Sequence, residues 1–152
     1  MTGTKATDAL LKDHLLINKI LESFTLDNPR FDHICKTLHR AVLSHSWFED
    51  EIFLPAVEAE PLLFRRFTDE IYQEHKDIDA LLKLLRKTPM AKKKELEFYA
   101  TELRVLLNTH FKKEEDALFP LTERILTEEG LIELGDEMKR RQTEVRQFIE
   151  PE

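Results

Sequence analysis

The chain has little glycine, a single cysteine and no long apolar run, and each of these shortages excludes a class of protein. Three glycines in 152 residues are too few for an all-β or loop-rich fold. Leu, Glu and Lys dominate instead, and because these residues favour helices we expect an all-α protein. The length suits one domain with a substantial core, which we expect to span residues 1–152.

The single cysteine and the lack of long apolar runs indicate the cellular compartment in which the protein is expected. Cys35 cannot form a disulfide within the chain, which agrees with a reducing environment. Because it lies beside Ile34 and Leu38, we expect a packed, unreactive thiol. No stretch approaches the roughly 20 apolar residues of a membrane span, and the N-terminus has no signal-peptide pattern. We therefore expect a cytoplasmic protein without a membrane partner.

Basic residues are also in short supply. The 23 Lys and Arg against 30 Asp and Glu give a formal net charge of −7. A nucleic-acid-binding protein usually has a basic face, so we expect no nucleic-acid partner. The one basic run, Lys92–Lys94, is interpreted as part of a solvated turn. The sequence identifies no protein partner.

Apolar residues at three- and four-residue spacings predict four long amphipathic helices separated by prolines and polar turns. We expect the first helix, capped by Thr7 or Asp8, to reach about Phe24, the second to run from Phe31 towards Pro55, the third from Pro61 to about Leu85, and the fourth from about Leu96 to near Pro120. Short connections predict an antiparallel up-down-up-down four-helix bundle over about residues 8–121, with a shorter extra helix at about residues 131–149 packed outside it.

One pattern occurs twice in the chain, as His45-Ser46-Trp47-Phe48-Glu49 and as His110-Phe111-Lys112-Lys113-Glu114. Both copies continue to a proline ten residues after the histidine. Histidine and glutamate four residues apart lie on one face of a helix, so each pair can offer an imidazole nitrogen and a carboxylate to the same metal ion. One such pair occurs often by chance, whereas two copies in matching context indicate a site.

Two further histidines, His14 and His75, stand on apolar helix faces where leucine would be expected. In an antiparallel bundle, residues at one height lie equally far from the turn that joins their helices. The midpoint of residues 14 and 45 is 29.5, that of 45 and 75 is 60, and that of 75 and 110 is 92.5. The first two fall on predicted turns, and the third lies about 3 residues past one, or ~4–5 Å. If that loop extends through the lysine run, all four histidines lie near one level.

Glu49 and Glu114 share the inward faces with these histidines, and an unpaired buried carboxylate costs several kcal/mol. Metal cations would balance the charge. We therefore predict a metal site with six ligands: His14, His45, Glu49, His75, His110 and Glu114. His33 and His39 have no partner at metal-binding spacing and are interpreted as hydrogen-bonded core residues.

Four imidazoles and two carboxylates are more ligands than one zinc ion needs. They suit two adjacent octahedral ions bridged by carboxylates, with iron favoured over zinc or manganese. Ferritin-like di-iron bundles require Glu-x-x-His. The residues three before the four histidines are Leu11, Val42, Tyr72 and Leu107. None is acidic, so that family is disfavoured.

The pattern His14 … His45-x3-Glu49 … His75 … His110-x3-Glu114 resembles the hemerythrin-like (HHE cation-binding) family in order, spacing and helix placement over about residues 8–121. By this resemblance, His14 and His45 would bind one iron ion, and His75 and His110 the other. Glu49 and Glu114 would bridge the two ions together with an oxo or hydroxo group.

The chain departs from oxygen-carrying hemerythrins at one position. Those proteins have a second histidine four residues after the third-helix ligand, where this chain has Asp79; Asn18 holds the matching place after His14. Asp79 is either an oxygen ligand or a neighbouring or solvent-facing group, and the second interpretation is favoured. Without an oxygen ligand from Asp79, the centre has one ligand fewer than an oxygen carrier.

Three functions fit these features. The leading hypothesis is a non-haem di-iron protein that binds or senses O2, NO, peroxide or iron. The second is a di-iron peroxidase, catalase or NO-reducing enzyme, with Tyr72 or Tyr99 as radical or hydrogen-bonding neighbours, although packing roles suit these tyrosines better. The third is a structural bundle stabilised by metal. The sequence leaves the choice between carrier, sensor and enzyme open.

Overall fold

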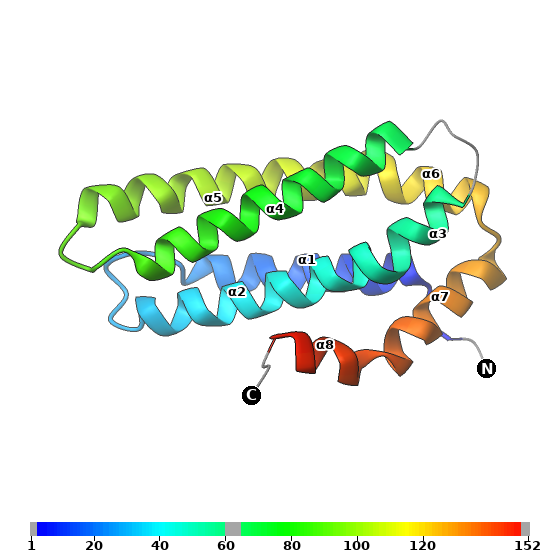
Figure 1. The fold of residues 1–152 in the computed structure, drawn as a ribbon, viewed down its shortest axis with the longest axis horizontal. Helices are drawn as coiled ribbons and strands as arrows, with labels where there is room; N and C mark the ends of the chain where they lie inside the picture. Colours follow the sequence, from blue (N-terminus) through cyan, green and yellow to red (C-terminus); the bar gives the residue numbers. More distant parts are fainter. Residues whose placement is uncertain (1–2, 60–64, 150–152) are drawn as a thin grey trace.

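A computed structural model describes residues 3–59 and 65–149 of the chain. Within these ranges every regular element is a helix (Figure 1), which confirms the predicted all-α class. In chain order the α-helices are α1 (Ala6–Glu22), α2 (Phe31–Phe48), α3 (Leu54–Glu58), α4 (Arg65–Lys87), α5 (Lys93–Lys113), α6 (Phe119–Ile125), α7 (Glu128–Arg140) and α8 (Gln142–Ile149). Two π-helical segments, η1 (Glu49–Phe53) and η3 (Glu114–Leu118), join α2 to α3 and α5 to α6.

The long helices α1, α2, α4 and α5 alternate in direction and pack side by side, as the predicted up-down-up-down bundle requires (Figure 1). The turn between α1 and α2 is closed by Asn28, whose side-chain oxygen accepts a hydrogen bond from the Arg30 backbone N–H at 2.9 Å. The predicted break at Glu60-Pro61 lies outside the described residues. The expected extension of the next loop through the lysine run is wrong, because α5 already begins at Lys93.

Neither the second nor the fourth long helix ends at its proline. The predicted end near Pro120 is wrong, and Pro55, where the sequence predicts a kink or an end, lies within a continuing helix. Each passes through a π-helical turn and continues beyond its proline, as α3 and α6. The Leu54 N–H donates to the carbonyl of Glu49, five residues back, in place of the four of an α-helix. The wider turn makes room for a proline, which has no N–H and would crowd the preceding turn of an α-helix.

The π-helical turns also change which residues face the core. Ala117 stands three residues after Glu114, where an uninterrupted α-helix would turn it to the same buried face. It is exposed instead, and Leu118 and Phe119 are buried. Because a π-turn holds more residues than an α-turn, the residues after it are rotated relative to an uninterrupted helix. Both π segments begin at a candidate metal ligand, Glu49 or Glu114.

The ends of the chain differ from the sequence-based expectation in two details. The C-terminal segment forms two helices, α7 and α8, in place of one, with a break at Arg141. Helix α7 packs on α1, and α8 packs on α2 (Figure 1). Thr7 does not cap α1, which begins at Ala6; its hydroxyl donates to the Glu123 carboxylate at 2.8 Å.

The core consists of two hydrophobic clusters. The distal cluster fills the bundle towards the α1–α2 and α4–α5 turns, and includes Ile17, Leu38, Leu82 and Leu103. The proximal cluster fills the other end with help from α7 and α8, and includes Leu10, Phe53, Ile71, Leu118 and Met138. The four candidate histidines belong to neither cluster, and their helices carry them between the two.

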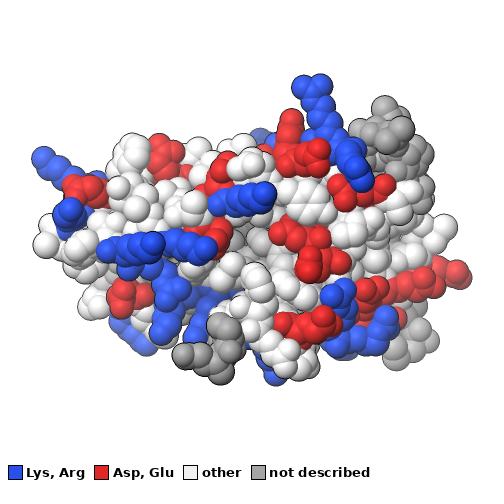
Figure 2. All heavy atoms as spheres, viewed as in Figure 1, with Lys and Arg blue, Asp and Glu red and all other residues white. Residues whose placement is uncertain are grey.

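Basic and acidic side chains are mixed on the surface of the protein. On the face in Figure 2, Lys and Arg side chains are interspersed with Asp and Glu. None of the described helices is both long and apolar enough to cross a membrane.

Gly135 is required where α7 approaches the N-terminal segment. A Cβ at this position would lie 2.0 Å from the Thr4 carbonyl oxygen, so Gly135→Ala should lower the free energy of unfolding by about 1–3 kcal/mol. Gly130, in the same helix, is the matched control, because a Cβ there meets nothing closer than 3.4 Å. Gly130→Ala should leave stability unchanged or raise it by up to about 1 kcal/mol. Urea unfolding of both variants tests this, and equal effects would contradict it.

Candidate metal centre

The six predicted ligands come together at one level of the bundle, and all are buried. The exposed fractions are 0% for Glu49 and Glu114, 1% for His14, 2% for His45 and His110, and 6% for His75. The ring centroids of His14 and His45 lie 4.8 Å apart, and those of His75 and His110 lie 4.9 Å apart. The four histidines therefore lie at one height, as the turn midpoints predict, even though α5 begins earlier than expected.

The donor atoms form two groups that share both glutamates. One group contains His14, His45, Glu49 and Glu114, and the other contains Glu49, His75, His110 and Glu114. Within each group the donor atoms lie within 4.8 Å of one another, so each could hold a metal ion. Each group draws its two histidines from a pair of adjacent helices.

The inward-facing nitrogens of the histidines contact the two glutamates. His14 Nε2 lies 2.9 Å from Glu114 Oε1, and His75 Nε2 lies 2.9 Å from Glu49 Oε1. Each glutamate is also 3.4 Å from the Nε2 of the histidine four residues before it, His45 or His110. Among the described residues, three buried atoms of the centre nevertheless have no hydrogen-bond partner: Glu49 Oε2, Glu114 Oε2 and His110 Nε2.

The outward-facing nitrogen of every candidate histidine contacts a second, more exposed carboxylate. The Nδ1–oxygen distances are 2.7 Å for His14–Glu115, 3.0 Å for His45–Asp13, 2.7 Å for His75–Asp50 and 2.7 Å for His110–Glu74. A carboxylate accepts, so Nδ1–H donates, and the lone pair of each neutral imidazole is on Nε2, facing inward. Histidines that bind metals are commonly oriented in this way.

These four carboxylates form a closed ring around the bundle. Asp13 on α1 contacts the histidine of α2, Asp50 after α2 contacts that of α4, Glu74 on α4 contacts that of α5, and Glu115 after α5 contacts that of α1. Sequence reasoning missed all four. Their signal was an acidic residue directly beside an expected ligand in every helix, as in Asp13-His14 and Glu49-Asp50.

The centre requires positive charge. With the Nδ1 protons directed outward, the Nε2 lone pairs of His14 and His45 face each other at 3.2 Å, and both carboxylates present further lone pairs. Only protons or cations can remove this repulsion. Imidazole nitrogens with carboxylate oxygens suit divalent iron, manganese and zinc, so these residues fit a pair of metal ions.

The electrostatics of the metal-free centre favour protonated imidazoles. Burial lowers the pKa values of His45, His75 and His110, but the neighbouring carboxylates raise them by more. Asp50 and Glu49 raise the pKa of His75 to about 10, and Glu114, Glu49 and Glu74 raise that of His110 to about 9. Burial raises the pKa of Glu49, but the charge of His45 and neighbouring hydrogen bonds hold it well below its usual value.

The remaining candidate residues lie away from the six. Asp79 Oδ1 accepts from His39 Nε2–H at 2.8 Å, and its other oxygen is 2.9 Å from Lys83 Nζ, which supports its interpretation as a non-ligand. His39 is buried and hydrogen-bonded as expected, whereas His33 is exposed and is not a core residue. Cys35 is buried, and burial together with the charge of Asp32 raises its pKa to about 11, as expected of an unreactive thiol.

An antiparallel helical bundle with two buried groups of histidine and glutamate defines a cation-binding helical domain. The model of the family described as Hemerythrin HHE cation binding domain matches residues 66–150, more than half of the chain. The chain therefore belongs to this family, which confirms the resemblance noted in the sequence.

A solved structure shows the same fold. The hemerythrin HHE cation binding domain-containing protein from Mycobacterium kansasii superimposes with a TM-score of 0.80 and 21% sequence identity, covering 94% of this chain and 88% of that chain. A search of curated proteins finds no significant match.

The metal-free protein should lose stability as the pH rises. His75 and His110 have raised pKa values in the folded state, so their protonation stabilises the fold fully below about pH 6.5. That contribution disappears as the pH passes through about 9 and about 10. Urea unfolding with a chelator present, between pH 6.5 and 10, should show a falling free energy of unfolding, and a flat profile would contradict this.

Removing one member of the carboxylate ring should weaken metal binding. Glu115→Ala leaves His14 without its Nδ1 partner, and losing such a contact typically costs about 10–100-fold in metal affinity. Asp116→Ala removes the exposed carboxylate next in sequence and should leave affinity unchanged. Anaerobic competition for Fe²⁺ against a chelator measures both. Equal affinities for the two variants would show that the ring does not support the site.

Proposed function

We propose that this chain is a non-haem di-iron protein whose buried centre binds or senses a small molecule such as O2, NO or peroxide. The observation that carries the proposal is the pair of donor groups that share Glu49 and Glu114. Two carboxylates within reach of both groups suit two adjacent ions better than one. His14 and His45 would hold one ion, and His75 and His110 the other.

The donor count supports binding of an external ligand. Two octahedral ions have about twelve coordination positions, and four imidazoles with two bridging carboxylates fill about eight of them. Asp79 is held by His39 and Lys83, so it does not add a donor. Iron ions in such a centre would supply open coordination positions and redox chemistry. In a purely structural metal site, protein ligands usually fill every coordination position.

The protein's own residues orient the imidazoles and exclude water. Each Nδ1–carboxylate contact fixes one ring, and the Lys113 ammonium holds Glu74 in turn. The His14 ring stacks on Phe111 with centroids 3.9 Å apart, and Phe119 lies 5.7 Å away. These contacts keep the donors in position before a ligand arrives, so little reorganisation is needed on binding.

The alternative function, a di-iron peroxidase, catalase or NO-reducing enzyme, depends on the same open coordination positions. The contacts of the two tyrosines do not support a role for them in such a reaction. The Tyr72 hydroxyl donates to Glu58 at 3.3 Å, and burial together with that carboxylate raises its pKa. Tyr99 packs against the distal hydrophobic cluster. If the protein is a peroxidase or catalase, its iron-loaded form should turn over peroxide faster than free iron does. Turnover no faster than that of free iron would exclude this alternative.

Iron loading with optical spectroscopy tests the proposal. The wild-type protein should bind two iron ions per chain, and its absorption spectrum should change on adding O2, NO or peroxide. His45→Ala should lose iron and the spectral response, whereas His39→Ala, which removes a buried histidine outside the centre, should keep both. A single ion per chain in the wild type, or a spectrum that responds to none of the three, would refute the di-iron proposal.

A further inference from the structure

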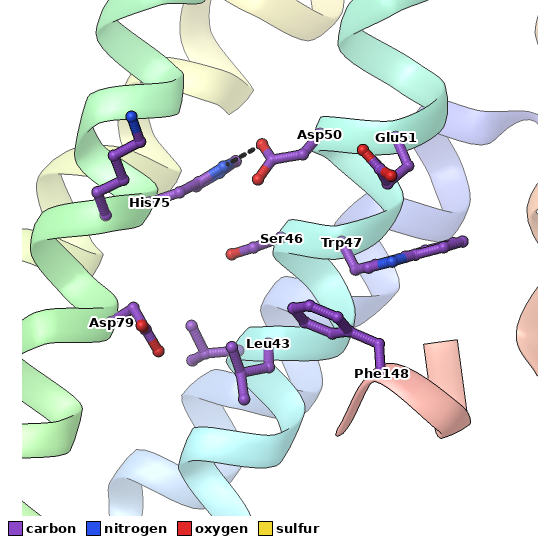
Figure 3. Close-up of a pocket in the computed structure, with 10 residues that line it drawn as sticks. Leu43, Ser46, Trp47, Asp50, Glu51, His75, Asp79 and Phe148 are labelled. Carbon is purple, nitrogen blue, oxygen red and sulfur yellow. Dashed lines mark hydrogen bonds and ion pairs between the residues drawn. The ribbon is translucent and has the colours of Figure 1, made fainter. Parts of the chain in front are cut away.

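A groove of about 340 Å³ runs along the outside of the bundle where α2, α4 and α8 meet. Its walls include the apolar side chains of Val42, Leu43, Trp47 and Phe148. Figure 3 shows Ser46 and the His75–Asp50 contact at its inner side, and the Phe148 ring reaching in from α8 beside Leu43. The groove is therefore walled by the bundle on its inner side and by the C-terminal helix on its outer side.

The inner end of the groove reaches the metal centre. His75 is a candidate ligand, and Asp50 is the carboxylate that orients it, with 2.7 Å between Nδ1 and Oδ1. Ser46 directly follows the candidate ligand His45, and its small side chain leaves space at this point. A molecule in the groove is thus separated from the centre by one imidazole and its immediate neighbours.

Two other flanks of the centre are covered. On the side of α1 and α5, the His14 ring is stacked on Phe111, with Phe119 beside it. On the side of α4 and α5, Lys113 bridges Glu74 and Glu70 across the approach to His110. Since all six candidate ligands are buried, an external ligand needs an opening, and the groove supplies one next to His75.

The lining of the groove favours small uncharged molecules. The apolar walls provide no partner for a hydrated anion. The charged residues that line it are Asp50, Glu51 and Asp79 against Lys76, an excess of negative charge that repels anions. Dioxygen and nitric oxide carry no charge and partition readily between apolar side chains.

We propose that this groove is the entrance through which small uncharged molecules such as NO and O2 reach the metal centre, and that Phe148 narrows its mouth. The proposal deepens the proposed function and rests on it. Phe148 is 55% exposed, so its ring can move without disturbing the core.

An entrance has a kinetic signature that distinguishes it from a ligand site. Residues that line only the path change the barrier for arrival and departure equally. Association and dissociation rates should therefore change by the same factor, and the dissociation constant should stay the same. A residue that touches the bound ligand or the metal changes the dissociation constant instead.

Stopped-flow binding of NO to the Fe²⁺-loaded protein is the test. Ser46→Phe, which fills the inner end, should slow association and dissociation by about tenfold each. Phe148→Ala, which removes the ring at the mouth, should speed both by a few fold. Two controls should leave both rates unchanged: Thr37→Phe, at an exposed position of α2 outside the groove, and Phe98→Ala, an exposed ring on α5.

Trp47, the one tryptophan of the chain, reports directly on the groove without any metal. Acrylamide quenching of its fluorescence should fall in Ser46→Phe and rise in Phe148→Ala. If quenching shows that the groove is filled while the NO rates are unchanged, or if the dissociation constant changes, the entrance is refuted. Rates unchanged in Phe148→Ala refute the role of that ring. A wild-type protein that binds iron but whose spectrum responds to none of NO, O2 and peroxide refutes the proposed function as well, since there is then no open position to reach.

Discussion

The contact between two buried carboxylates and four imidazoles is the constraint on which the rest of the structure depends. Glu49 and Glu114 are fully buried, and the inward-facing nitrogens of His14 and His75 lie 2.9 Å from them. Burying charge in this way is unfavourable unless cations or protons compensate it. The apolar clusters above and below the centre offset that cost, and the outer carboxylates hold the rings in the one orientation that directs every Nε2 inward.

The position of the centre between two cores has a further consequence. The distal cluster packs the bundle without the C-terminal helices, whereas the proximal cluster depends on Met138 and Val145 from α7 and α8. The π-helical turns lie on the proximal side and begin at the two glutamates. Wide turns at functional residues are common, because they let a helix present a ligand and still continue. The C-terminal helices therefore cover the end of the bundle where the main helices are least regular.

Much of the fold and the centre could be predicted from the sequence, because periodicity and turn midpoints fix which residues share a face and a height. The π-turns could not, since Pro55 and Pro120 indicate a helix end unless the wider hydrogen bonding around them is known. The break at Arg141 has no proline or glycine to mark it. The four outer carboxylates could not be predicted either, because the chain has 30 acidic residues and an acidic residue beside a histidine is common by chance.

The arrangement of that outer ring follows from helix geometry. Successive residues of an α-helix are rotated by about 100°, so the neighbour of an inward-facing ligand points towards the next helix. On α1 and α4 the acid precedes the ligand, as Asp13 and Glu74. After α2 and α5 it follows the ligand, as Asp50 and Glu115. Antiparallel helices rotate in opposite senses when viewed from one end of the bundle. The residue before the ligand on α1 and α4 and the residue after the ligand on α2 and α5 are therefore displaced in the same rotational sense around the bundle. As a result, the four carboxylate–histidine contacts close into a single ring.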